Sequence, residues 1–172
     1  MAIDADAAGP EVRNPARIAL LVGLTAVVGL VGVAGWLGFR ASAIHREDQR
    51  QAAYLEVARQ GAVNLTTIDH REVEADVKRI LDSATGPFYD DFSSRAQPFI
   101  DVVKKAQSTS VGTVVSAGIE SETDHDAQVL VAVSVKTAIA DGSDQQPRSW
   151  RMRIAVQRQG DQLKVSNVSF VP

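Results

Sequence analysis

Hydrophobic and polar positions divide the chain into an apolar block, a stretch of helical period and a stretch of strand alternation. Residues 18–39 form the apolar block, which contains no charged residue and no proline. A helix of that length rises about 33 Å, enough to cross a hydrocarbon core of about 30 Å. Arg17 and Arg40 flank the block, and Trp36 lies where an aromatic ring would meet the membrane interface. The pattern predicts a transmembrane helix over residues 17–40.

A cleaved signal peptide is the alternative interpretation of this block, because residues 41–43 read Ala-Ser-Ala, the form of a cleavage site. Signal peptides have apolar cores of roughly 7 to 15 residues, however, and the block is longer. Arg40 also directly precedes the site. A retained signal anchor is therefore favoured. Residues 1–16 are rich in alanine and interrupted by two prolines, so we expect a disordered tail there.

Small residues in the block offer a face for a second membrane helix. Ala34 and Gly38 are four residues apart, and Gly29 and Gly32 precede them. Small residues at this spacing let two helices approach closely, although glycine is common in membrane helices generally. Arginines lie on both sides of the block, so the charge distribution leaves its orientation open.

A helical period resumes after the block and predicts a helical stalk over residues 41–66 that enters a folded domain over residues 67–172. Asp69 and Glu72 have the spacing of a capping box before a second helix. Pro87 is a favoured first residue for a third helix, and Pro98 is expected to break or kink it. The apolar faces of the second and third helices comprise Val73, Val77, Ile80, Leu81, Phe88, Phe92, Phe99, Ile100 and Val103.

Beyond residue 105 the apolar period changes from about 3.6 to 2, which predicts strands. Short polar breaks separate them and suit antiparallel neighbours. The predicted strands cover residues 109–119, 129–139, 150–156 and 163–170. Helices followed by strands indicate an α+β domain in which a four-stranded meander packs on the helices. The inward positions that we predict are aliphatic: Val129, Val131, Val133, Val135 and Ile154.

Composition narrows the function classes. The 172 residues leave room for one domain after the apolar block. The formal net charge of −3 gives no field that would attract nucleic acid, so we expect no nucleic-acid partner. The chain has no cysteine, which excludes disulfides and thiolate metal sites.

Candidate catalytic and metal-binding residues are few. His45, His70 and His125 fall at positions that suggest solvent. Asp69 with His70 resembles a pair for proton transfer, but a helix cap explains the aspartate more simply. Acidic residues and a histidine gather in one predicted turn, where a solvated hairpin tip is favoured over a divalent-cation site: Glu120, Glu122, Asp124, His125 and Asp126. The sequence predicts no catalytic residues, no metal and no cofactor.

Four basic residues are candidates for a docking surface. Arg148, Arg151, Arg153 and Lys164 place positive charge on the outward positions or ends of the last two predicted strands. Such a face suits an acidic partner or anionic lipid headgroups. A solvated sheet face is the alternative interpretation.

Three stretches resemble the Mce-associated membrane proteins of actinobacteria. They are the alanine-rich run at residues 52–60 with residues 65–69, then residues 80–86 with Phe88, then residues 113–115, 127–133 and 163–171. The likeness covers the chain from about Arg40 onward in the same order. Leu163 is a departure, because members of the family often carry tryptophan there.

The resemblance implies an NTF2-like or VirB8-like cone of about three helices on a curved four-stranded antiparallel sheet. It further implies a cytoplasmic N-terminus, a single pass through the plasma membrane and a C-terminal domain in the periplasm or cell envelope. The expected role is a non-enzymatic accessory subunit that assembles with Mce transporter subunits and stabilises their import of sterols or fatty acids. Two alternatives stay open: a module that holds a sterol or acyl chain in an apolar cone, and a ketosteroid-isomerase-like enzyme with an inward Asp or Tyr.

Overall fold

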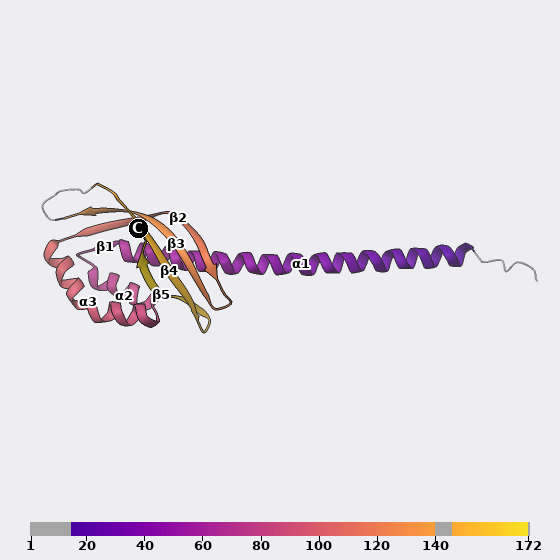
Figure 1. The fold of residues 1–172 in the computed structure, drawn as a ribbon, viewed down its shortest axis with the longest axis horizontal. Helices are drawn as coiled ribbons and strands as arrows, with labels where there is room; N and C mark the ends of the chain where they lie inside the picture. Colours follow the sequence, from indigo (N-terminus) through magenta and orange to yellow (C-terminus); the bar gives the residue numbers. More distant parts are fainter. Residues whose placement is uncertain (1–14, 140–145, 172) are drawn as a thin grey trace, which may run out of the picture. The chain divides into compact units, whose positions relative to one another are not determined.

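The structure, a computed structural model, describes residues 15–139 and 146–171. Within the first helix, the side chains of residues 15–28, 33–34, 37–39 and 41–46 lie outside the description. The chain divides into two units, Met1–Glu47 and Asp48–Pro172. Helix α1 (Pro15–Thr66) contributes residues to both (Figure 1).

The first unit contains the predicted membrane span. Among the residues that the structure describes, no helix is both long and apolar enough to cross a membrane. Most side chains of residues 17–40 lie outside the described set, including Ala34 and Gly38, so the span and its helix-partner face stay predictions. Gly29 and Gly32 are described, and a Cβ atom at either position would meet nothing within 4 Å.

The second unit continues α1 into an α+β domain, as predicted. Its sheet is antiparallel, and its strands follow the chain in the order β1-β2-β3-β4-β5. The remaining elements are β1 (Ile68–Asp69), α2 (Val73–Ser83), α3 (Gly86–Ala106), β2 (Thr109–Glu122), β3 (Asp126–Ala138), β4 (Arg148–Gln159) and β5 (Gln162–Phe170). The four predicted strands are confirmed as β2 to β5. The sheet has five strands rather than four, because the two residues of β1 pair with Thr109 and Ser110 at the start of β2.

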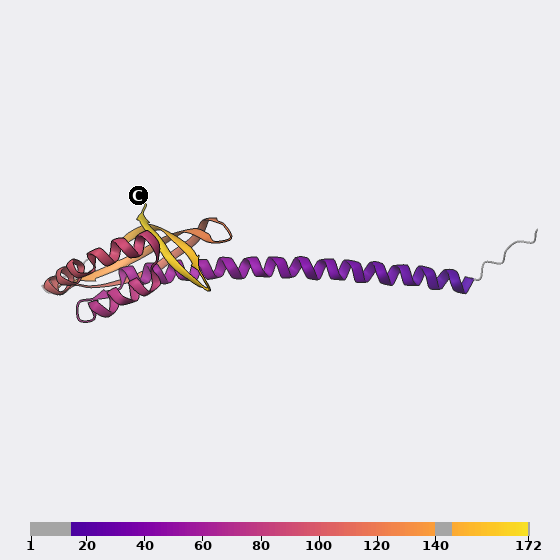
Figure 2. The same cartoon turned by 90° about the horizontal axis from the view of Figure 1, so that it is seen from below.

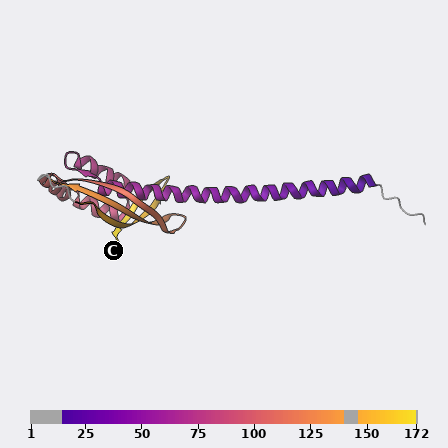
Figure 3. The same ribbon diagram turned by 90° about the horizontal axis from the view of Figure 1, so that it is seen from above.

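The helices of this unit cover one face of the curved sheet (Figures 1 and 2). The view from the opposite side has the strands in front (Figure 3). All five predicted inward residues of β3 and β4 are buried, and they pack against Tyr54, Ala58 and Ala62 of α1. A second cluster joins Val73, Val77 and Ile80 of α2 with residues of α3. The alternation read from the sequence therefore identified the core face correctly.

Two glycines let α1 approach the sheet closely. A Cβ atom at Gly61 of α1 would lie 2.9 Å from Cγ2 of Val165 in β5. A Cβ atom at Gly112 of β2 would lie 1.8 Å from Oγ1 and 2.6 Å from Cβ of Thr66. The backbone N–H of Gly112 also donates to Thr67 Oγ1 at 3.1 Å. The end of α1 therefore rests directly on the backbone of β2.

One local prediction is wrong, and a second holds only in part. Asp69 does not cap α2, because it lies in β1, and the N-cap residue Glu72 makes no side-chain capping hydrogen bond. Asp69 instead accepts hydrogen bonds from the backbone and side chain of Arg71. Pro87 does lie in the first turn of α3, as predicted. The helix does not break at Pro98, since α3 continues through it, although Figure 1 shows α3 bending along its length.

Candidate functional site

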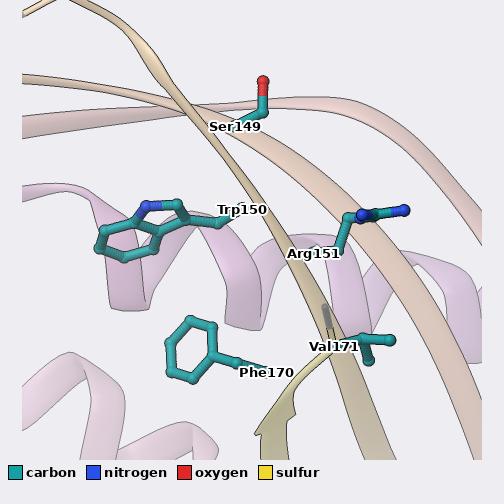
Figure 4. Close-up of a pocket in the computed structure, with 5 residues that line it drawn as sticks. All are labelled: Ser149, Trp150, Arg151, Phe170 and Val171. Atoms are coloured by element: carbon teal, nitrogen blue, oxygen red, sulfur yellow. The ribbon is translucent and has the colours of Figure 1, made fainter.

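An edge notch forms where β5 ends beside β4. Phe170, the last residue of β5, pairs with Met152, and Val171 N–H donates to Arg151 O at 2.9 Å. The first residues of β4 have no β5 partner among the described residues. The resulting opening measures about 360 Å³ and is lined by Ser149, Trp150, Arg151, Phe170 and Val171 (Figure 4).

Two aromatic side chains line one side of the edge notch. Trp150 and Phe170 stand edge to face, with ring centroids 5.7 Å apart and an interplanar angle of 85°. Both are exposed, Trp150 to 38% and Phe170 to 68%. Aromatic side chains contribute much of the binding energy at protein interfaces, so an exposed pair marks a candidate contact surface.

A second space, the outer groove, lies on the uncovered face of the sheet. It measures about 240 Å³ and is lined by Ser116, Leu130, Val131, Ala132, Arg151, Met152 and Val171. Leu130 is 38% exposed, and its partners in register are Gly118 of β2 and Arg153 of β4. Arg151 and Val171 belong to both spaces, so the outer groove and the edge notch adjoin.

The two arginines of this surface differ in their partners. Arg153 donates to both carboxylate oxygens of Glu120, at 2.6 and 2.8 Å. These hydrogen bonds lower the pKa of Glu120 and raise the pKa of Arg153. Arg151 is exposed, and its side chain has no hydrogen bond or ion pair with any described residue. None of the described residues that line the groove or the notch is acidic, so among them Arg151 is a charge without an acidic neighbour.

The structure divides the basic face that the sequence predicted. Arg151 and Arg153 occupy successive outward positions of β4, about 7 Å apart by strand geometry. Arg148 has the opposite alternation, that of Trp150. Lys164 pairs in register with Gln157, roughly 20 Å along the strand from Arg151. The four residues therefore do not form one cluster.

Sequence reasoning missed the apolar part of this surface. Trp150 shares the alternation of the inward residue Ile154, but its place beyond the end of β5 exposes it. Phe170 is exposed because it is the last residue of β5. Leu130 carried a readable signal, because it is a large apolar residue at an outward position of β3.

An inner cavity of about 220 Å³ lies on the covered face, next to the edge notch. Its lining comprises Leu65, Thr66, Ile68, Phe99, Val103, Ser108, Ser110, Val135, Thr137 and Trp150. None of these is an acid or a base. Ligand pockets for drug-sized molecules usually measure about 300–1,000 Å³, so this cavity by itself is small.

The residues considered for proton transfer lie elsewhere. His70 is half-buried, with Nδ1 3.3 Å from Thr109 Oγ1 and 3.5 Å from a carboxylate oxygen of Asp69. Hydrogen bonds from the Arg71 side chain and N–H hold the pKa of Asp69 well below its usual range. His125 is exposed, and the side chain of His45 lies outside the described residues. Neither His70 nor Asp69 lines the inner cavity.

Two interior polar residues were not anticipated. Tyr54 of α1 is fully buried in the main core, and its hydroxyl has no hydrogen-bond partner among the described residues. Asp76 of α2 is also buried and accepts hydrogen bonds from Arg79 Nη2 at 2.8 Å and from Asp69 N at 2.8 Å. Neither Tyr54 nor Asp76 lines the inner cavity, so we assign both residues a structural role.

The acidic residues around the β2–β3 turn are engaged by arginines. Arg50 contacts Glu122 at 2.9 Å and Asp124 at 3.1 Å, while Glu120 pairs with Arg153. Within the described ranges, no group of His, Cys, Asp or Glu side chains is arranged to hold a metal ion. These carboxylates therefore join the turn to α1 and β2 to β4.

Comparison with known sequences places the chain near a mycobacterial protein. A family model described as "Uncharacterized protein Rv1363c/MT1408-like" matches residues 15–172. Rv1363c of Mycobacterium tuberculosis (strain ATCC 25618 / H37Rv) is 36% identical over 164 residues, which cover 94% of this chain and 63% of that protein. The chain thus spans less than two thirds of the length of this relative.

Solved structures share the fold. The periplasmic domain of DotI matches with a TM-score of 0.60 and 14% identity, over 70% of this chain and 94% of the other. An IcmL-like type IV secretion system protein of Legionella pneumophila matches with a TM-score of 0.58 and 12% identity, over 71% and 92%. CagV of Helicobacter pylori, a VirB8 homologue, matches with a TM-score of 0.53 and 9% identity, over 70% and 97%. The likeness shows a VirB8-like, NTF2-like α+β fold.

Proposed function

We propose that this chain, which belongs to the Rv1363c/MT1408-like family, is a non-enzymatic accessory subunit that docks on other envelope proteins through the outer groove of its sheet. The observation that carries the proposal is the composition of that groove. Exposed Leu130 and Arg151 line it, and Arg153, which pairs in register with Leu130, forms an ion pair with Glu120. Protein interfaces commonly combine an apolar centre, arginine and a polar rim.

We further propose the Mce lipid-import complex as the assembly, with residues 17–40 as the anchor in the plasma membrane and the second unit on the outer side. The support is the resemblance of residues 52–60, 80–86 and 127–133 to Mce-associated membrane proteins. A fold shared with periplasmic domains of type IV secretion systems is consistent with an exported docking domain. Mce subunits, other membrane helices and the bilayer are the proposed partners.

Affinity purification tests both parts of the proposal. The tagged full chain, cross-linked in membranes of its host, should recover Mce subunits. Leu130→Asp should abolish the recovery, because it replaces the apolar side chain of the groove with a charged one that lies opposite Arg153. Gln128→Asp, one outward position away on β3 and outside the groove, is the matched control and should recover as much as the unmodified chain.

Three outcomes would contradict the proposal. If the unmodified chain recovers no Mce subunit, and deleting its gene changes neither their abundance nor lipid uptake, the Mce assignment fails. If Leu130→Asp recovers as much as Gln128→Asp, the outer groove is not the docking surface. A soluble substrate turned over by the purified chain would refute the non-enzymatic assignment.

A further inference from the structure

Trp150 lines both the edge notch and the inner cavity. The notch opens at the edge of the sheet beyond the end of β5, whereas the cavity lies between the sheet and the ends of α1 and α3. One side chain therefore forms a wall of each. If the indole turned aside, the two spaces would be continuous.

No hydrogen bond to a described residue fixes the position of the Trp150 indole. Its N–H donates to no described residue, although tryptophan in a packed site usually finds an acceptor. Its aromatic neighbour, Phe170, touches it by an edge and is itself 68% exposed. Packing alone therefore holds the side chain, and a rotamer change would break no hydrogen bond.

The combined space suits one kind of ligand. The inner cavity alone is below the usual range of about 300–1,000 Å³ for small-molecule pockets, but cavity and notch together fall within it. Leu65, Ile68, Phe99, Val103 and Val135 make the inner wall apolar.

The charge of Arg151 indicates which chemical group the other end of the ligand carries. Among the described residues, Arg151 lines the notch without an acidic partner, and none of those that line either space is Asp or Glu. A guanidinium binds a carboxylate in bidentate geometry. Figure 4 shows Arg151 and Trp150 pointing away from opposite sides of β4, so a ligand reaching both passes through the notch around the strand edge.

We propose that the inner cavity and the edge notch are two parts of one binding site for an apolar molecule that ends in a carboxylate, with Trp150 as the movable wall between them. The apolar body enters the inner cavity and the carboxylate binds Arg151. This site shares Arg151 with the outer groove, but its apolar part, the inner cavity, lies on the opposite face of the sheet.

The test uses the purified full chain in a non-ionic detergent, with Trp36→Phe so that Trp150 is the single tryptophan. Labelling with 5-fluorotryptophan then gives one ¹⁹F resonance that reports on the movable wall. The probe is 4-phenylbutyrate, and its neutral isostere 4-phenylbutanamide is the control ligand. We expect a saturable shift of the resonance with the acid and binding about tenfold weaker with the amide, since a charged hydrogen bond contributes about 1.5–3 kcal/mol.

Paired variants separate the two ends of the site. Arg151→Gln should weaken binding of the acid about tenfold, whereas Arg158→Gln, an exposed arginine at the other end of β4, should not. Thr137→Leu fills the inner cavity and should abolish the saturable shift. Thr113→Leu is the same change at an exposed outward position of β2 and should leave it intact. Ser110→Val is the smaller filling variant if Thr137→Leu unfolds, as circular dichroism would show.

A shift that rises linearly without saturation would overturn the proposal. Equal affinity for the acid and the amide would show that Arg151 does not bind the ligand. Unchanged binding by both filling variants would show that the ligand does not enter the inner cavity. Because the purified chain is tested without partners, failure here leaves the docking proposal intact, and failure of the membrane pull-down leaves this one intact.

Discussion

Replacing Gly112 with alanine should destabilise the second unit, because the end of α1 leaves no space for a Cβ atom at this position. The new atom would lie 1.8 Å from Thr66 Oγ1, 2.6 Å from Thr66 Cβ and 3.3 Å from Val133 Cγ1. The first two atoms belong to a buried side chain near its backbone, so they cannot turn aside. Either α1 or β2 must shift.

The magnitude follows from two opposing effects. Overpacking a close-packed interior costs about 1–3 kcal/mol, and contact with a Cβ atom points to the upper end of that range. Alanine is about 0.5–1 kcal/mol better than glycine within a strand. We therefore expect Gly112→Ala to lower the free energy of unfolding by about 1–2 kcal/mol. Gly118→Ala is the control on the same strand, because its Cβ would meet nothing within 4 Å, and it should be neutral or slightly stabilising.

Urea unfolding of the Trp36→Phe chain, followed by the fluorescence of Trp150, measures both variants. Adding Thr66→Ala to Gly112→Ala removes the nearest clashing atom but leaves the Cβ contact, so the double variant should recover part of the lost stability. Equal stability of Gly112→Ala and the parent chain would refute the close approach of α1 to β2. Equal losses in Gly112→Ala and Gly118→Ala would attribute the effect to the strand backbone instead.

Three further substitutions test single interactions. Tyr54→Phe removes a buried hydroxyl that has no partner, so the urea midpoint should stay constant or rise; a loss above about 1 kcal/mol would show that the hydroxyl is hydrogen-bonded. Asp76→Ala should cost about 1–3 kcal/mol in the same assay, because it leaves the Asp69 N–H without its acceptor and removes the carboxylate paired with Arg79; an unchanged midpoint would contradict this. Glu120 has a pKa lowered by Arg153, so its contribution is complete above the ordinary value of about 4.5 and disappears as pH falls below it. The stability difference between the parent chain and Glu120→Gln should thus be constant above about pH 5.5 and shrink toward pH 3, and a difference that grows on acidification would reverse the assigned sign.

The period of the apolar residues predicted most helices and strands of the second unit. Residues that face the core are apolar, and they recur along the chain with the period of their helix or strand. Val129 and Val131 alternate with outward residues in the sequence, and both are buried in the structure. β1 could not be predicted in this way, since two residues are too few to show a period. The cap assigned to Asp69 failed because pairing with β2 draws this residue into the sheet, where Arg71 takes up its carboxylate.

The candidate site was predictable in part. Alternation alone places Arg151 and Arg153 on one face of β4. It cannot reveal that Glu120 lies at a register irregularity of β2, from which it reaches Arg153 and leaves Arg151 unpaired. The edge notch depends on the relative lengths of β4 and β5 and on their register, which pairing between strands sets. Features set by the residues of a single strand could therefore be predicted from the sequence, whereas features that depend on how neighbouring strands pair could not.

The ion pairs of Arg50 stabilise one end of the sheet and not the other. At the β2–β3 turn, Arg50 joins α1 to Glu122 and Asp124. At the other end of β3, the register reaches Arg148 beside the exposed Trp150. Breathing motions of the unit should therefore start at the β4 end, and amide hydrogen exchange should be faster around Ser149 than around Ala127. Ion pairs therefore hold the second unit at its β2–β3 turn, and we expect ligands or partners to bind at the opposite end of the sheet.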